Sequence, residues 1–307
     1  MRIAMLTWEY PPRIVGGIAR HVEELSQALV NHGHEVHVFT ADHPEVPEHE
    51  IVQGVHLHRA RGDNAPTPDF LSWILHLNFN IARMAFETQR LVAFDLFHAH
   101  DWLVTQSAYL LKKALDLPIV ATLHATEAGR MKGLHNALSR YIAQQEWCLT
   151  YEAYRAITCS WTMNNEIQAQ FSVPADKIDV IPNGIVHQKF HFDFPDRMIF
   201  RRRLALDFEK IVMFVGRMVP EKGAQFLIEA APQILERYPD AKFIIIGRGG
   251  FLDELKTRAG ALNLGHKCLF TGYVDDATLL RIYRIADVAV VPSLYEPFGI
   301  VALEGMA

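Results

Sequence analysis

The regular alternation of short apolar runs with longer amphipathic segments constrains the fold of this chain most. In the first half, runs such as "RIAMLT" and "EVHVFT" are separated by stretches with helical periodicity. In "IARHVEELSQALVNHG", Ile18, Val22, Leu25 and Leu29 recur on one helical face, and Gly33 fits the position just past the helix end. Strands that alternate with helices of this length indicate βαβ units, with helices on both faces of a parallel sheet.

The alternation is interrupted once, in the segment "PNGIVHQKFHFDFPD". This segment contains Pro182 and Pro195 and shows no clear helical or strand period. A second alternating series begins at "EKIVMFVGR" and continues to "DVAVVPS". We therefore predict an α/β protein with two Rossmann-like, doubly wound domains, residues 1–190 and 191–307. A length of 307 residues is enough for two cores.

Charge and composition exclude several classes of protein. A net charge of -5 argues against a general nucleic-acid binder, which needs a cationic surface. The amino-terminal apolar run is closed by Trp8 and Glu9, so we expect no secretory leader, and the stretch "FLSWILHLNFNIA" is too short and polar to cross a bilayer. Cys148, Cys159 and Cys268 show no metal or redox spacing. We therefore expect reduced cysteines in a cytoplasmic protein.

Five unusual features directly follow predicted strands, where ligands bind in open α/β sheets. The first is "PPRIVGGIARHVEEL", with Gly16 and Gly17 between the first strand and the first helix. Adjacent glycines allow a backbone to approach a ligand closely, and free N–H groups at a helix amino terminus attract anions. A tight structural turn explains the same pair equally well.

The next two features place histidines at strand ends. In "HAHDW", His98 and His100 share one face of a strand, which suggests a zinc site, but no third ligand has a persuasive spacing. We prefer a strand end with one buried histidine, with Asp101 at its tip to accept hydrogen bonds from ligand hydroxyls. In "TLHATEAGR", His124 ends an apolar strand, so its imidazole is expected to project into the crevice.

The fourth feature is "FVGRMVPEKGAQFL". Arg217 stands at a strand tip, and Lys222 opens the next helix, where the helix dipole disfavours a cation. A bound anion would reverse that penalty. Two cations near one diphosphate each contribute about 4 kcal/mol at 4 Å for an effective dielectric near 20, before desolvation, which is enough to hold it without a metal. The alternative is a solvated Glu-Lys turn.

The fifth feature is the segment from "DVAVVPS" to "EPFGIVALEGMA", which we interpret as a buried strand, a turn and a helix start. Pro297 and Gly299 suit the first helical turn. The N–H groups of residues 298–300 (Phe298, Gly299 and Ile300) would then be available to phosphate oxygens.

Two glutamates flank this turn. If the helix continues, Glu304 lies about two turns in, on the same side as Glu296. The two carboxylates would then bind two groups of hydroxyls on one ligand. The alternative is a capping glutamate followed by a solvated one.

Taken together, these motifs resemble the retaining glycosyltransferases of family 4, which have the two-domain GT-B fold. The resemblance covers the whole chain in order, through "EYPP", Gly-Gly, "HAHDW", "VIPNGI", "GRMVPEKG" and "PSLYEPFGIVALEGMA". The amino-terminal motifs are most similar to bacterial and archaeal glycogen synthases and to related α-glucan or maltose-1-phosphate synthases. The resemblance implies two Rossmann-like domains that face each other across a cleft.

The resemblance also implies an activity. The enzyme would be a hexosyltransferase that moves a sugar, glucose by resemblance, from a nucleotide-diphosphate donor such as ADP-glucose or UDP-glucose. The acceptor would be a glucan, an oligosaccharide or a sugar phosphate, and the anomeric configuration would be retained. The leaving phosphate would help to take the acceptor's proton. No cofactor or divalent metal is expected, consistent with the absence of an Asp-x-Asp site.

Carried over residue by residue, the resemblance assigns roles to the predicted site. Arg217 and Lys222 would contact the departing diphosphate. Glu296 would contact hydroxyls of the donor sugar, and Glu304 the ribose.

In the first domain, Gly17, next to Gly16, would approach the diphosphate. His124 would hydrogen-bond the donor sugar near the reacting carbon, with Asp101 at the acceptor side.

Two departures from the family pattern stand out. Many bacterial glycogen synthases have a lysine directly before Val-Gly-Gly, where this chain has Ile14 with Arg13 before it. Family members also continue well beyond the second glutamate, so we expect a truncated second domain with exposed apolar surface.

Three alternative functions remain from the sequence. They are a nucleotide-sugar epimerase of the same fold, a non-catalytic nucleotide-sugar or glucan-binding module, and a metal-dependent hydrolase built on His98 and His100.

Overall fold

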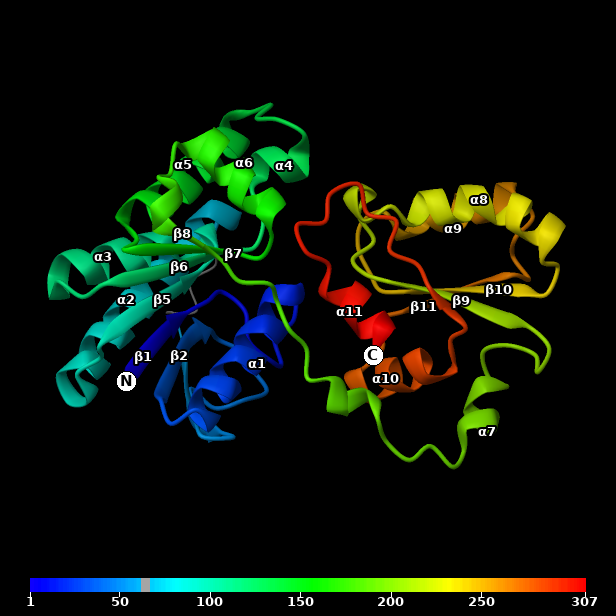
Figure 1. Cartoon of the computed structure of the whole chain (residues 1–307), viewed down its shortest axis with the longest axis horizontal. Helices are drawn as coiled ribbons and strands as arrows, with labels where there is room; N and C mark the ends of the chain where they lie inside the picture. Colours follow the sequence, from blue (N-terminus) through cyan, green and yellow to red (C-terminus); the bar gives the residue numbers. More distant parts are fainter. Residues whose placement is uncertain (62–66) are drawn as a thin grey trace. The chain divides into compact units, whose positions relative to one another are not determined.

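The chain divides into two compact units, Met1–Asn183 and Gly184–Ala307 (Figure 1). The structure is a computed structural model that describes residues 1–61 and 67–307. The boundary predicted between residues 190 and 191 lies a short way further along, at the end of the 3-10 helix His187–Phe190. Each unit is an α/β layer structure with its own sheet, as the alternation of the sequence predicts.

The first unit contains an eight-stranded sheet in the order β3-β4-β2-β1-β5-β6-β7-β8, in which every pairing is parallel except that of β3 with β4. Its strands are β1 (Arg2–Leu6), β2 (Glu35–Ala41), β3 (His49–Val52), β4 (Val55–Ala60), β5 (Leu96–His100), β6 (Ile119–Leu123), β7 (Arg155–Thr158) and β8 (Ile178–Val180). Its helices are α1 (Gly17–Asn31), α2 (Phe70–Val92), α3 (Thr105–Leu115), α4 (Glu127–Met131), α5 (Ala137–Glu152) and α6 (Trp161–Phe171).

Helix α1 covers one face of this sheet through the apolar stripe that the sequence shows. Val22 is fully buried against Val36 and Val38 of β2, with Val55 and Leu57 of β4 in the same cluster. The intervening residues of β2 and β4 therefore point to the opposite face. Burying side chains on both faces explains why the strands read as continuous apolar runs.

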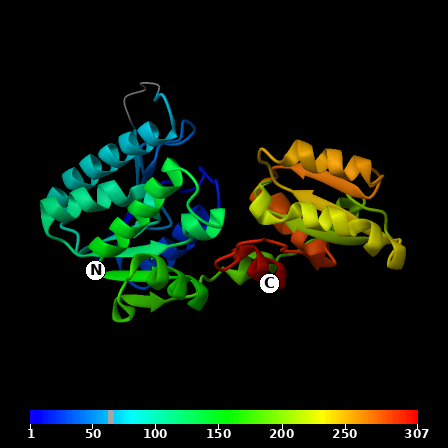
Figure 2. The same cartoon turned by 90° about the horizontal axis from the view of Figure 1, so that it is seen from above.

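Helices α2 and α3 lie side by side in the first unit (Figure 2). The buried amide of Asn78 in α2 joins them to the segment that follows β5. Its Nδ2 donates to the carbonyl of Leu103 at 2.8 Å, and its Oδ1 accepts from the N–H of Ser107 at 2.8 Å. A buried amide with both partners satisfied fixes that segment relative to α2.

The second unit contains a four-stranded parallel sheet in the order β11-β10-β9-β12. Its strands are β9 (Lys210–Val215), β10 (Ala241–Ile246), β11 (Cys268–Gly272) and β12 (Val288–Ala289). Its helices are α7 (Arg197–Arg201), α8 (Ala224–Arg237), α9 (Leu252–Ala261), α10 (Asp276–Ile285) and α11 (Ile300–Met306).

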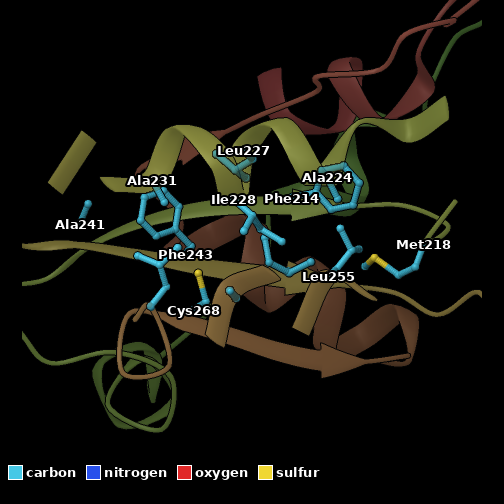
Figure 3. Close-up of a cluster of buried hydrophobic side chains, with 13 residues drawn as sticks. Phe214, Met218, Ala224, Leu227, Ile228, Ala231, Ala241, Phe243, Leu255 and Cys268 are labelled. Carbon is cyan, nitrogen blue, oxygen red and sulfur yellow. The ribbon is translucent and has the colours of Figure 1, made fainter. Parts of the chain in front are cut away.

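Alternate residues of β10 bury opposite faces of the second sheet. Phe243 and Ile245 pack in one cluster with Ile228 of α8 and Leu255 of α9 (Figure 3). Ile244 and Ile246 pack on the other side, in a cluster with Leu279, Ile282 and Ile285 of α10. The doubly wound arrangement predicted from the sequence is therefore confirmed in this unit.

Two predictions at the end of the chain are wrong in detail. The run "DVAVVPS" forms only the two-residue strand β12, at the sheet edge, where Val288 is 51% exposed. Helix α11 begins at Ile300, after Gly299 at a φ of 85°. Pro297 therefore precedes the helix, and Glu304 lies about one turn in, because a glycine in the left-handed region interrupts the helical path.

Among the helices of the described residues, none is both long enough and apolar enough to cross a membrane.

Candidate active site

In the second unit, two loops far apart in the sequence meet backbone to backbone at Gly223. Gly223 has a φ of +76°, and a Cβ added to it would lie 1.9 Å from the carbonyl oxygen of Pro292. Beside it, the N–H of Leu294 donates to the carbonyl of Glu221 at 2.8 Å. Only glycine permits this approach without displacing the backbone. This packing brings the motifs "EKG" and "PSLYEPFG" together.

We expect Gly223→Ala to lower the free energy of unfolding by at least about 2 kcal/mol, because it adds left-handed strain and a backbone clash. Gly260→Ala is the matched control: a Cβ there meets open space within α9, so alanine should be neutral or stabilising by up to about 1 kcal/mol. Urea unfolding of both variants measures the difference. Equal stabilities would contradict the described packing of the loops.

The joined loops pair Lys222 with Glu296. Lys222 Nζ lies 2.7 Å from Glu296 Oε2, and Ser293 Oγ donates to the same oxygen at 2.9 Å. Both charged side chains are 25% exposed. Lys222 ends the 3-10 helix Pro220–Lys222, and Gly223 separates it from α8. Glu296 compensates the unfavourable effect of the α8 dipole on the charge of Lys222. The sequence predicts a ligand anion as the compensating group, and the ion pair shows that Glu296 also compensates the charge of Lys222.

Arg217 follows β9 and contacts a different carboxylate. Its Nη2 lies 3.4 Å from Glu221 Oε1, and its side chain is 42% exposed. Exposed pairs of this kind contribute about 0–1 kcal/mol, so the guanidinium can exchange this partner at low cost. Both predicted diphosphate contacts therefore lie next to carboxylates, one tightly paired and one loosely.

A third loop, which the sequence analysis did not single out, packs against the segment of Arg217. A Cβ on Gly247 would lie 1.9 Å from the carbonyl oxygen of Gly216, and one on Gly249 would lie 2.3 Å from that of Met218. The N–H of Met218 donates to the carbonyl of Arg248 at 2.9 Å. The glycines of "GRGG" directly after a predicted strand were the signal available in the sequence.

Glu304 has different surroundings from Glu296. It is 8% exposed, and its Oε2 accepts a hydrogen bond from Tyr283 Oη of α10 at 2.7 Å. Helix α11 approaches β12 closely, because a Cβ on Gly305 would lie 2.8 Å from that of Ala289. The sequence shows Tyr283 only as one aromatic residue within a predicted helix, so it did not indicate this contact with Glu304.

In the first unit, Glu9 organises the loop between β1 and α1. It is 1% exposed, and its Oε2 accepts hydrogen bonds from the N–H groups of Val15 and Gly16 at 2.5 and 3.0 Å. Gly16 is the residue before α1, which begins at Gly17. The loop that carries the two glycines is therefore built around a buried carboxylate, which the sequence analysis missed.

Histidines from three elements gather at the carboxyl ends of β5 and β6. His21 of α1, His100 of β5 and His124 each offer a ring nitrogen, and these nitrogens lie within 4.8 Å of one another. His98 is not part of this group, since its Nε2 is 2.8 Å from Thr122 Oγ1. The structure therefore groups His100 with His21 and His124 rather than with His98. The sequence spacing of these three histidines did not show that they lie together.

Burial keeps these imidazoles neutral. It lowers the pKa of His21 to about 4 and that of His98 to about 3, and it holds the pKa values of His100 and His124 well below the usual value. His100 Nδ1 lies 3.4 Å from His124 Nε2. At neutral pH, His124 is therefore a neutral hydrogen-bonding group rather than a cation.

Asp101 follows β5 in a strained backbone conformation. Its φ of 67° lies in the left-handed region that favours glycine, and its carboxylate accepts from the N–H of Trp102 at 3.2 Å. The residue is 6% exposed, and burial raises its pKa to about 6, which the charge of Arg130 opposes. A strained, buried carboxyl at a strand tip favours a functional role.

Arg130 is surrounded by several carboxyl groups. Its Nη2 donates to Glu127 Oε2 at 2.7 Å, and the N–H of Glu127 donates to Glu146 Oε1 at 2.8 Å. Glu146 is fully buried, and burial, with a smaller effect of Asp101, raises its pKa to about 9. Sequence reasoning missed Glu146, although a lone acid among the buried positions of α5 was visible in "IAQQEWCL".

We expect the contribution of Glu146 to the free energy of unfolding to fall as the pH rises from about 4.5 to 9, because the unfolded state then loses a proton that buried Glu146 keeps. Glu146→Gln retains an oxygen for the N–H of Glu127 but does not titrate. The difference in free energy of unfolding between Glu146→Gln and the wild type should therefore shift in favour of the variant by at least about 2 kcal/mol from pH 5 to pH 9. Urea unfolding at each pH measures this, with exposed Glu45→Gln as control. Parallel curves for the wild type and Glu146→Gln would contradict the assignment.

Both units match models of known protein families. The model of Glycosyltransferase Family 4 matches residues 15–189, and the model of Glycosyl transferases group 1 matches residues 196–307. An uncharacterised glycosyltransferase of Methanocaldococcus jannaschii is 41% identical over all of this chain and 78% of its own length. A glycogen synthase of Mycobacterium tuberculosis is 37% identical over all of this chain and 76% of its own length.

Solved structures share the fold. A sucrose-phosphate synthase from Thermosynechococcus elongatus has a TM-score of 0.80 at 23% identity, covering 99% of this chain and 78% of its own. Anabaena HepE in complex with UDP-glucose has a TM-score of 0.76 at 20% identity, covering 100% of this chain and 78% of its own. The resemblance drawn from the sequence motifs is confirmed: the chain belongs to glycosyltransferase family 4, and it is a glycosyltransferase of the GT-B fold.

Proposed function

We propose that the chain transfers a hexose, with glucose the first candidate, from a nucleotide-diphosphate sugar to a glucan or sugar acceptor with retention of configuration. The observation that carries the proposal is the junction at Gly223, which holds Lys222 next to Glu296 at the carboxyl end of the second sheet. The relative named glycogen synthase supports glucose and a glucan. The neighbours solved with UDP-glucose, or with ADP and acarbose, support a nucleotide-sugar donor.

On the donor side, we assign Lys222 and Arg217 to the diphosphate. Its two negative charges would compete with Glu296 for Lys222 and with Glu221 for Arg217. Glu296 would then accept hydrogen bonds from hydroxyls of the donor sugar, and Glu304 from the ribose. Two cations that meet the charge developing on the leaving group lower the barrier to its departure.

From the first unit, we assign His124 to the donor sugar and Asp101 to the acceptor side. A neutral imidazole at His124 would hydrogen-bond the donor sugar without repelling a cationic transition state. Ionised Asp101 would accept a hydrogen bond from an acceptor hydroxyl. The acceptor oxygen forms its bond to the anomeric carbon on the face from which the diphosphate departs, and a diphosphate oxygen takes the acceptor's proton. The roles proposed here require no metal or prosthetic group.

The test is transfer from ADP-glucose or UDP-glucose to a maltooligosaccharide, with the product followed by proton NMR. An α-linked product from the α-linked donor supports the proposal, whereas a β-linked product contradicts retention. Conversion of the donor to its epimer without an acceptor would instead support the epimerase alternative. Activity that persists in a metal chelator would exclude the metal-dependent hydrolase.

A further inference from the structure

A second group of histidines lies on the sheet of the first unit, away from the site described above. Glu35 and His37 stand two residues apart on β2, and His37 pairs across the sheet with His56 of β4. Because side chains alternate along a strand, all three point to the same face, opposite the apolar residues that contact α1. They lie near the amino ends of β2 and β4, whereas Asp101 and His124 follow the carboxyl ends of β5 and β6.

The donor atoms of these three residues lie close together. His37 Nε2 lies 3.2 Å from Glu35 Oε1, and the rings of His37 and His56 stack with centroids 4.3 Å apart. One donor atom from each residue lies within 4.8 Å of the other two. Ligands bonded at 2.0–2.1 Å to a tetrahedral ion stand about 3.3 Å apart, so His37 and Glu35 already have the required separation. The ring of His56 stacks nearly parallel to that of His37, at 5°, so it has to turn before its nitrogen lone pair points at the same ion.

Neighbouring side chains fix the orientation of His37. Its Nδ1 lies 2.9 Å from His58 Nε2, and Phe94 packs edge-on against its ring at a centroid distance of 5.1 Å. His37 is 3% exposed, so the surrounding packing holds its ring in place. A metal-bound histidine ordinarily donates its other ring N–H to a neighbour, and His58 is placed to accept it.

Charges around the group are compatible with a cation. Arg2 Nε lies 3.4 Å from Glu35 Oε2, whereas His37 lies next to the other oxygen, Oε1. Arg2 therefore repels a second cation, but it contacts Oε2 and not Oε1, the oxygen that would bind the ion. The side chain of Glu35 is 44% exposed, which gives an ion a path from solvent.

We propose that Glu35, His37 and His56 bind one divalent ion of the zinc class, which ties β4 to β2. The ion takes the Nε2 lone pair of His37, whose ring proton resides on Nδ1 and is donated to His58. Two imidazoles and a carboxylate suit zinc and its neighbours in the transition series rather than Mg²⁺ or Ca²⁺, which prefer oxygen ligands. Water completes the tetrahedron. The role is structural, and it is independent of the proposed transfer reaction.

The test uses the full chain without a histidine tag, stripped with chelator and titrated with Zn²⁺ against a chromophoric chelator. We expect one tight site, with the affinity at least about 100-fold weaker in His56→Gln and in Glu35→Gln. Both positions are more exposed than His37, so these variants should fold. His266→Gln, an exposed histidine of the second unit, is the matched control and should bind Zn²⁺ like the wild type.

A second readout is stability. Zn²⁺ should raise the melting temperature of the wild type, with little rise in His56→Gln, because an ion that binds only the folded state stabilises it. Three results would overturn the proposal. One is Zn²⁺ binding unchanged in both variants. Another is binding lost in His124→Gln instead, which would place the ion at the group of His21, His100 and His124. The last is an absence of stoichiometric binding at micromolar Zn²⁺.

Discussion

Lys222→Ala is expected to lower kcat/KM for the nucleotide-sugar donor by about 10²–10³-fold. The lysine is the more enclosed of the two cations assigned to the diphosphate, and a group that meets charge on a leaving group contributes on this scale. Its effect should appear in kcat as well as in KM, because the charge on the diphosphate grows in the transition state. Initial rates over a range of donor concentrations measure both.

Two variants control this result. Lys210→Ala removes an exposed lysine at the opposite end of β9, and it should leave the rate within about twofold of the wild type. Comparing Lys222→Ala/Glu296→Gln with Glu296→Gln alone shows whether the loss arises from the unpaired carboxylate that Lys222→Ala leaves behind, since the lysine substitution would then cost little activity when Glu296→Gln is already present. Full activity in Lys222→Ala would contradict the diphosphate assignment.

Asp101→Asn is expected to lower the transfer rate by about 100-fold and to flatten the acid side of its pH profile. Burial raises the pKa of Asp101 to about 6, so the carboxylate accepts a hydrogen bond fully only above that pH. Wild-type kcat/KM should therefore fall as the pH drops from 7 to 5. Asparagine does not titrate, so the variant should be slow but nearly constant over this range.

The control for this prediction is Asp176→Asn, which changes an exposed aspartate of the same unit. This variant should keep the transfer rate of the wild type and the same fall of kcat/KM between pH 7 and 5. An acid limb near pH 6 that persists in Asp101→Asn would show that another group titrates, and it would remove Asp101 from the acceptor side.

The order and type of the main elements were predictable because both faces of each sheet are buried. Strands such as β10, with Phe243 on one face and Ile244 on the other, read as continuous apolar runs between amphipathic helices. The last elements were less predictable. Strand β12 lies at a sheet edge, and Gly299 turns the chain before α11, so neither follows the periodic pattern.

For the candidate site, the sequence indicated individual residues but not their partners. Lys222 and Glu296 stood out by position, yet their ion pair depends on the contact between Gly223 and Pro292, which no local pattern records. His21 was missed for the same reason, since it reaches His124 from a helix earlier in the chain. Tertiary contacts between distant segments therefore account for most of what the sequence did not show.

The most direct test of the central claim is calorimetric titration of the full chain with ADP-glucose, UDP-glucose and GDP-mannose, alongside Lys222→Ala. We predict that one donor binds with a one-to-one stoichiometry, and that its Kd rises at least about tenfold in the variant, in line with the loss of a charge-assisted contact. Circular dichroism confirms that both proteins are folded. A folded wild-type chain that binds none of the donors, or binds one with the same Kd in Lys222→Ala, would contradict the account.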